Sequence, residues 1–227
     1  MLFVISQMFR VFDRRGAIAA LLIGLFISFV ANFTWLILLL IFAISSHLAT
    51  RAWFNYKKTI KVQEGQSGER GYTNVMYAAL IGIFIASFQG LGDLSFLPSL
   101  PYFLLFAISF SVVNADTFAS EIGVLDKKVY LITTFKRVTP GTNGGVSLLG
   151  TSVSVLGAFI IGLTYSLLTY GAFNYYPVLL ITAFGFVGNV IDSLLGALFE
   201  NRRILSKGQV NLFAAVFGTV LSLPLIL

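Results

Sequence analysis

The chain alternates between long stretches without charged side chains and short stretches that are rich in them. Five stretches contain no Asp, Glu, Lys or Arg: 16–50, 71–92, 94–115, 138–191 and 208–227. A membrane-spanning helix needs about 20 apolar residues to cross roughly 30 Å of hydrocarbon. The stretches therefore have room for two, one, one, two and one spans. The pattern predicts an all-α integral membrane protein with about seven transmembrane helices.

We expect these helices in a single transmembrane domain over residues 1–227, at about 16–31, 33–50, 73–91, 100–119, 146–169, 176–199 and 209–226. Loops are expected at about 51–72, 120–145 and 200–208. Apolar residues recur at helical spacing within 1–12. This spacing predicts a short N-terminal interfacial or re-entrant helix there.

The composition agrees with this class and narrows the chemistry. Apolar residues make up 57% of the chain and charged residues 11%, and mean hydropathy is +0.91. A soluble domain of this size needs more charge to cover its surface. With no cysteine and one histidine, His47, the sequence excludes cysteine nucleophiles, disulfide scaffolds and multi-histidine metal sites. We expect His47 to be a packed or hydrogen-bonded residue.

The basic residues predict how the chain is oriented. All 15 Lys and Arg fall in alternate segments, at 10–15, 51–70, 127–137 and 202–207. Basic segments of this kind stay in the cytoplasm. We therefore expect a multi-pass protein of the cell membrane with its N-terminus cytoplasmic and its C-terminus outside. The net charge of +6 follows this membrane rule, and no nucleic-acid partner is expected.

Three carboxylates lie in or at the ends of predicted spans, where ionisable groups by default mark function. Asp116 and Glu121 end the fourth span, and Asp192 lies in the sixth, with Asn189 one turn before it. The direction of both spans places all three acids near the cytoplasmic face. Asp116 and Glu121 are about 140° apart on an ideal helix, so they share a ligand only if the helix ends or unwinds between them. The alternative is that the acids pair with basic residues and hold spans together.

A glycine-rich segment precedes the fifth span at the same level, comprising Gly141, Thr142, Asn143, Gly144 and Gly145. Glycines let the backbone approach a ligand closely, and the following helix N-terminus favours anions. Lys136 and Arg137 stand just upstream. The segment lacks the lysine of a P-loop, and alone it is equally compatible with an ordinary turn. Beside the acids it predicts a phosphate site next to Mg²⁺, which takes carboxylates plus substrate phosphates.

Two further groups stand at this face. Arg14 and Arg15 directly precede the first span, and Arg70 and Asn74 lie at the start of the third. Arginine binds phosphate through two parallel hydrogen bonds, so these residues are candidates for holding a lipid phosphate. The alternative is a charge cluster that only sets topology.

These motifs, in their order along the chain, resemble those of the phytyl-phosphate kinase family, including its transmembrane protein 19-like members. The matching stretches are 13–17, 69–75, 115–123, 140–150 and 191–197. The chain differs from the family pattern at Phe118, where Trp is usual, and over 76–79. The resemblance implies transfer of a phosphoryl group from a nucleoside triphosphate, CTP above all, to an isoprenoid monophosphate drawn from the membrane lipids.

The sequence thus favours a Mg²⁺-dependent prenyl-phosphate kinase over two alternatives. Asp116, Glu121 and Asp192 are expected to hold Mg²⁺ with help from Asn189. The same site would serve a nucleotidyltransferase that makes a CDP-lipid. A transporter is disfavoured because the acids gather at one face and no internal repeat is visible.

Overall fold

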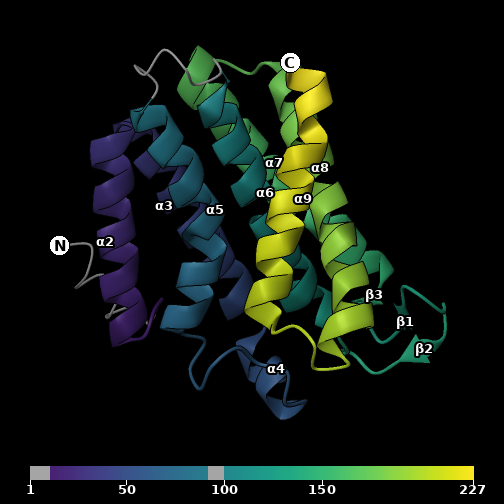
Figure 1. The fold of residues 1–227 in the computed structure, drawn as a ribbon. Helices are drawn as coiled ribbons and strands as arrows, with labels where there is room; N and C mark the ends of the chain where they lie inside the picture. Colours follow the sequence, from purple (N-terminus) through teal and green to yellow (C-terminus); the bar gives the residue numbers. More distant parts are fainter. Residues whose placement is uncertain (1–10, 92–99) are drawn as a thin grey trace.

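The structure is a computed structural model that describes residues 11–91 and 100–227, and eight helices lie within them. Seven are long and run side by side (Figure 1). They are α2 (Arg14–Val30), α3 (Phe33–Arg51), α5 (Tyr72–Gly90), α6 (Tyr102–Ile122), α7 (Leu148–Tyr170), α8 (Tyr175–Leu195) and α9 (Lys207–Ile226). The eighth, α4 (Phe54–Thr59), is short. The bounds of the long helices run close to the expected ones.

Six of these helices, α3 and α5 to α9, are long and apolar enough to cross a membrane. Helix α2 is shorter, at 17 residues, and lies alongside them. The predicted all-α membrane fold is confirmed, and the chain is an integral multi-pass membrane protein. The interfacial helix expected at 1–12 falls outside the described residues, apart from Val11 and Phe12.

Local capping explains where the helices begin. Asp13 accepts a hydrogen bond from the Gly16 N–H and starts α2, and Asn32 accepts from Thr34 and Trp35 at the start of α3. Ser206 and Gln209 form a capping box at the start of α9. Side-chain oxygens at this position satisfy N–H groups that have no partner within the helix.

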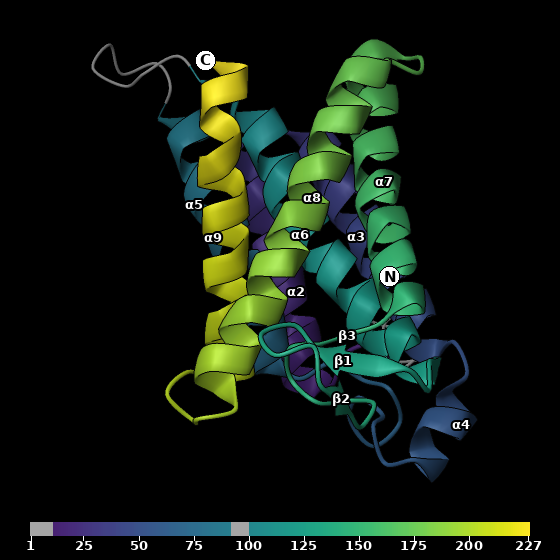
Figure 2. The same ribbon diagram turned by 90° about the vertical axis from the view of Figure 1, so that its right-hand side faces the viewer.

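Helix α6 is the centre of the bundle (Figure 2). Of its most apolar window 72% is buried, against 33–39% in the other five spanning candidates. Asn114 in α6 accepts hydrogen bonds from Ser45 and Ser46 of α3 and donates to the Gly157 carbonyl of α7 (2.8 Å). One buried amide therefore fixes α3 and α7 against α6.

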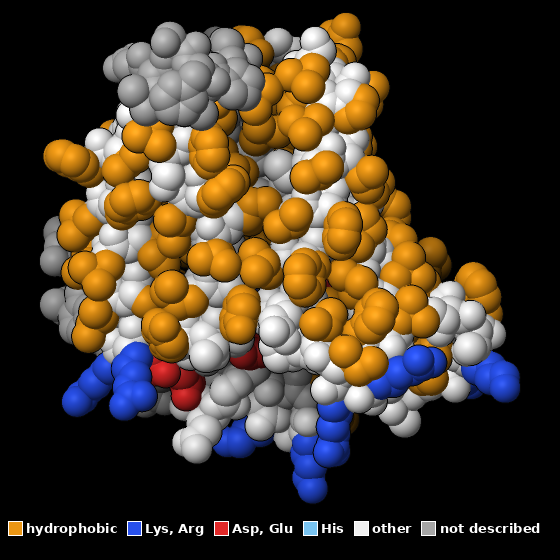
Figure 3. Space-filling model, in the orientation of Figure 1, with side chains coloured by type: hydrophobic (Ala, Val, Ile, Leu, Met, Phe, Trp, Pro, Cys, Tyr) orange, Lys and Arg blue, Asp and Glu red, His pale blue; other side chains and the backbone are white. Residues whose placement is uncertain are grey.

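The segment expected as the loop at 120–145 contains a small antiparallel sheet that the sequence did not predict. It begins with a 3₁₀ turn, η1 (Gly123–Leu125), and continues through β1 (Val129–Leu131), β2 (Arg137–Val138) and β3 (Gly145–Val146), in the order β2-β1-β3. The sheet and α4 lie at one end of the bundle and the C-terminus at the other (Figure 1). Lys, Arg, Asp and Glu side chains gather at that same end in Figure 3, below an apolar belt.

Candidate functional site

A polar cavity of about 350 Å³ lies at the charged end of the bundle, between α6, α8, α9 and the glycine-rich segment 141–145. Its charged and amide side chains come from five separate parts of the chain. They are Lys61, Gln63, Glu64, Asp116, Asn143, Asn189, Asp192, Glu200, Lys207 and Asn211. Of the predicted site residues, this cavity collects Asp116, Asn189, Asp192 and the whole glycine-rich segment.

Small residues bring α6 and α8 close enough for their acids to meet. A Cβ atom added at Gly188 of α8 would overlap the side chain of Val112 in α6. Small residues at a helix interface permit such close approach of backbones. Asp192 lies one turn beyond Gly188, and Asp116 one turn beyond Val112. The tight crossing therefore sets the two carboxyl groups face to face.

Asp116 and Asp192 interact directly through their carboxyl groups. Two carboxylates in contact repel each other unless they share a proton or a cation lies between them. Asn211 of α9, with its amide nitrogen turned toward Asp192, donates to Oδ2 of that residue (3.1 Å) and to the Lys207 carbonyl (3.0 Å). Helix α9 thus orients one of the two acids.

Two buried amide oxygens in the cavity have no hydrogen-bond partner among the described residues. They are Oδ1 of Asn189 and Oε1 of Gln63. A buried polar atom without a partner costs free energy, so an orphaned atom in a cavity indicates a ligand that satisfies it. Asn189 is one turn from Asp192 on α8, and both residues line the same cavity as Asp116.

Lysine and glutamate side chains flank the paired acids. Lys207 Nζ lies 3.7 Å from Glu64 Oε2, and 54% of the Lys207 side chain is exposed. Glu64 also accepts a hydrogen bond from Asn74 Nδ2 (2.6 Å). Sequence reasoning had identified neither Lys207 nor Glu64. The one local signal was the i, i+4 spacing of Lys207 and Asn211 at the start of α9.

The glycine-rich segment has the backbone that its residues predicted. Gly141 and Gly144 have positive φ angles of +85° and +74°. A Cβ at Gly144 would lie 2.5 Å from the Ala197 Cβ and 2.6 Å from the Ser193 carbonyl oxygen. The side chain of Asn201 donates to the Asn143 carbonyl (3.0 Å). The segment therefore packs closely against the C-terminal end of α8. A π-helical turn, η2 (Gly196–Glu200), follows α8 there.

The start of α7 is less open to anions than expected. The Gly150 N–H already donates to Ser147 Oγ (3.0 Å), and the Leu149 N–H to Asp126 Oδ2 (3.5 Å). The backbone N–H of Lys128, with that of Leu149, lowers the pKa of Asp126 below its usual value. The N–H groups of Leu149 and Gly150 are therefore not free to bind an anion as the sequence predicted.

Glu121 does not share the cavity with Asp116, and this corrects the three-carboxylate arrangement predicted from sequence. Helix α6 continues without a break to Ile122, so the two side chains stay on different faces. Glu121 Oε2 accepts from Lys57 Nζ (2.6 Å), and Oε1 accepts from Thr50 Oγ1 (3.2 Å). The Glu121 carboxylate thus forms a buried ion pair. This is the alternative given above, in which an acid pairs with a basic residue and holds helices together.

Four predicted phosphate-binding cations stand outside the polar cavity. Arg14 and Arg15 are exposed at the start of α2, and Lys136 and Arg137 are exposed on the sheet. Arg137 donates to the Lys127 carbonyl (3.2 Å). The structure therefore brings none of these four to the paired acids, whereas Lys61 and Lys207 line the same cavity.

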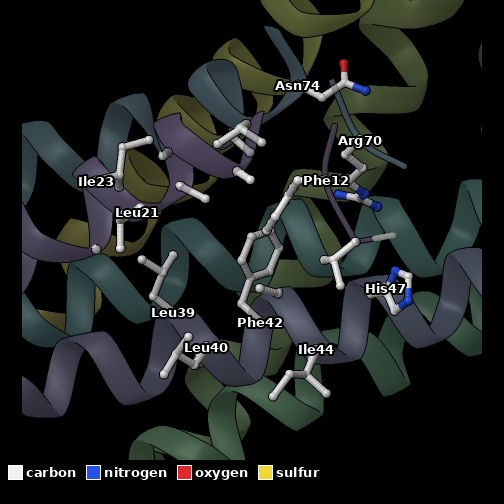
Figure 4. A pocket seen from close by; sticks show the side chains of 18 of the residues that line it. Phe12, Leu21, Ile23, Leu39, Leu40, Phe42, Ile44, His47, Arg70 and Asn74 are labelled. Carbon is white, nitrogen blue, oxygen red and sulfur yellow. The ribbon is translucent and has the colours of Figure 1, made fainter. Parts of the chain in front are cut away.

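Arg70 and Asn74 line a second, apolar cavity of about 470 Å³ between α2, α3 and α5. Figure 4 shows them at one end of it with His47, whereas Leu21, Ile23, Leu39 and Leu40 lie farther along. Arg70 Nη2 donates to Thr117 Oγ1 (3.2 Å). Thr117 is the residue that follows Asp116 in α6. Sequence reasoning had not foreseen this cavity.

The residues of the polar cavity suit Mg²⁺. Across residues 11–91 and 100–227, no group of three or more His, Cys, Asp or Glu is arranged to hold one metal ion. Mg²⁺ requires less, because it usually binds through one or two carboxylates and completes its shell with substrate phosphates and water. Asp116 and Asp192 would offer two carboxylates, and Asn189 Oδ1 would offer an oxygen that has no hydrogen-bond partner within residues 11–91 and 100–227.

Comparison with known proteins places the chain among membrane proteins. The sequence profile of the family described as integral membrane protein DUF92 matches residues 1–219. An uncharacterized membrane protein of Methanocaldococcus jannaschii is 37% identical over 93% of this chain and 84% of its own length.

Two Arabidopsis thaliana proteins are similar as well. Protein PGR is 30% identical over 83% of this chain and 72% of its own length. Protein VTE6, chloroplastic, is 29% identical over 77% of this chain and 53% of its own. No solved structure matches the chain.

Proposed function

Because the chain belongs to the DUF92 family of integral membrane proteins, and its motifs resemble those of phytyl-phosphate kinases, we propose that it is a prenyl-phosphate kinase. In this proposal it transfers the γ-phosphoryl group of a nucleoside triphosphate, CTP above all, to an isoprenoid monophosphate. The products are the isoprenoid diphosphate and the nucleoside diphosphate. The reaction takes place at the charged end of the bundle, which we assign to the cytoplasmic face.

The observation that carries this proposal is that Asp116, Asp192 and Asn189, whose Oδ1 has no partner among the described residues, line one cavity with the glycine-rich segment. Phosphoryl transfer depends mainly on positioning and on neutralising charge. Bound Mg²⁺ would supply charge neutralisation between the phosphates and the two acids. The backbone of 141–145 can approach the nucleotide phosphates, and Lys61 and Lys207 add positive charge.

The acceptor needs little activation by the protein. An oxygen of the isoprenoid phosphate forms the new bond to the γ-phosphorus, and the bond from that phosphorus to the β,γ-bridging oxygen breaks. The acceptor phosphate is anionic at neutral pH, so no side chain has to remove a proton from it. This agrees with the cavity, whose described lining contains no histidine.

A product assay tests the proposal. Purified protein in lipid nanodiscs is incubated with Mg²⁺, geranylgeranyl phosphate and each of the four common nucleoside triphosphates. We expect the isoprenoid diphosphate and, with CTP, equimolar CDP. Release of pyrophosphate with a CDP-lipid would assign a nucleotidyltransferase instead. No lipid product with any nucleotide, across several prenyl phosphates, would refute both reactions.

A further inference from the structure

The second cavity has the composition of a site for hydrocarbon, with a cation at one end. Its walls are mostly apolar side chains of α2, α3 and α5, and its polar lining comprises His47, Arg70 and Asn74. Small side chains leave the space: Ala17, Ala20 and Gly24 on α2, and Ala78 on α5. A purely apolar void would need no arginine, which is costly to hold inside a membrane protein.

The cavity opens sideways toward lipid. Leu25 of α2 is 59% exposed and Leu48 of α3 is 62% exposed, and both line the cavity. These residues therefore face the cavity and the lipid side of the bundle together. A lipid tail can enter between α2 and α3 without crossing the polar cavity.

The polar end of this cavity adjoins the paired acids. Asn74 lines the apolar cavity, and its amide donates to Glu64, which lines the polar one. Arg70 binds Thr117, the residue after Asp116. The backbone of Arg70 is held in turn by Val11 and Asp13 (both 3.1 Å). An anion on Arg70 would therefore sit at the boundary between the two cavities.

We propose that the apolar cavity between α2, α3 and α5 holds the hydrocarbon tail of one single-chain lipid phosphate, with Arg70 on its phosphate. This inference rests on the proposed function and adds the tail site and its capacity. The α3 lining runs from Leu36 to Leu48, about 18 Å at helical rise. With C–C bonds of about 1.5 Å, each isoprene unit extends roughly 5 Å, so the cavity takes about three to four units.

The experiment measures binding of prenyl monophosphates with one to six isoprene units to the full chain in nanodiscs, without nucleotide. We expect affinity to rise with tail length up to about four units and then to level off. Ala43→Phe in α3 and Ala78→Phe in α5 fill the cavity. Each should weaken binding of the four-unit lipid about 10-fold or more and leave the one-unit compound unchanged. Arg70→Gln should weaken every length alike.

Ala183→Phe is the matched control, because Ala183 is exposed on α8 and lines neither cavity; it should bind like the wild type. Affinity independent of tail length, or of both filling substitutions, would overturn the tail site. If both filled variants misfold, photocrosslinking decides: a photoreactive prenyl phosphate should label α2, α3 or α5 of the wild type, and labelling confined to α7–α9 would overturn the site. Tail-dependent binding without turnover would refute the kinase alone.

Discussion

Lys57 and Glu121 form an ion pair that is almost wholly buried. Their Nζ and Oε2 atoms are 2.6 Å apart, and the exposed fractions of the two side chains are 0% and 8%. Lys57 also donates to the carbonyls of Thr50 (2.6 Å) and Ala49 (3.3 Å). A single ammonium therefore joins α4 to the ends of α3 and α6, and Glu121 has a structural partner.

Breaking this pair should destabilise the protein without abolishing its response to Mg²⁺. Glu121→Gln leaves a buried ammonium without its counter-charge, which typically costs about 3–5 kcal/mol. Replacing both partners, as in Lys57→Met with Glu121→Leu, should restore much of that loss. Thermal unfolding in detergent, with and without Mg²⁺, measures both effects. A Glu121→Gln variant of normal stability that no longer responds to Mg²⁺ would make Glu121 a metal ligand after all.

Asp116→Asn and Asp192→Asn should each remove Mg²⁺-dependent stabilisation and turnover. A group that only supports a metal ligand typically changes affinity or activity by roughly 10- to 100-fold, and these two should exceed that range. A ligand that binds only the folded state raises the unfolding temperature, so titration with Mg²⁺ reports binding directly. Asp126→Asn is the control, since Asp126 lies outside both cavities. Equal Mg²⁺ affinity in all three variants would contradict the assignment.

Asn189 and Asn114 offer a comparison between two buried amides. Asn189→Leu removes an oxygen that has no partner in the described part of the chain, so metal-free stability should change little while the Mg²⁺ response is lost. Asn114→Leu removes three hydrogen bonds to α3 and α7. Each buried group left unsatisfied costs about 1–3 kcal/mol, so stability should fall while the Mg²⁺ response persists. The reverse pattern in unfolding experiments would remove Asn189 from the site.

Substitutions at Gly144 and Gly171 distinguish the effect of backbone strain from an effect on the polar cavity. Both have positive φ, +74° and +68°, which costs a residue with a Cβ about 1–2 kcal/mol. A Cβ at Gly171 meets no atom of the described residues within 4 Å, whereas one at Gly144 meets Ala197 and Ser193. Gly171→Ala should lose only stability. Gly144→Ala should also weaken nucleotide binding, measured by equilibrium dialysis. Equal nucleotide affinity in the two variants would show that the segment does not approach the nucleotide.

The sequence was most informative where structure is set locally. The lengths of the segments without charged residues indicate where the spans lie. The side chains of Asp13, Asn32 and Ser147 cap helices by accepting hydrogen bonds from N–H groups no more than three residues away. Helix direction also placed Asp116 and Asp192 at the same end. Their contact additionally depends on Gly188 and Val112, whose close packing cannot be inferred from either helix alone.

Features that depend on distant parts of the chain were beyond the sequence. Lys57 meets Glu121 across 64 residues, and its place in a charged loop gave no sign of burial. The apolar cavity results from small side chains on α2 and α5 opposing α3. Their periodicity is that of ordinary helix packing. The unbroken course of α6 decided the position of Glu121, where the sequence left an unwound end open.

Asn74 lies between the apolar cavity and the polar cavity, at the end of the apolar cavity that also contains Arg70. A lipid phosphate that moves from Arg70 toward Asp116 would remain at the depth of the lipid headgroups. Moving such an ion through the hydrocarbon interior would carry a Born energy of many kcal/mol. Because the two cavities adjoin, the proposed reaction needs no movement of charge across the membrane, and its substrate and product can exchange by lateral diffusion within one leaflet.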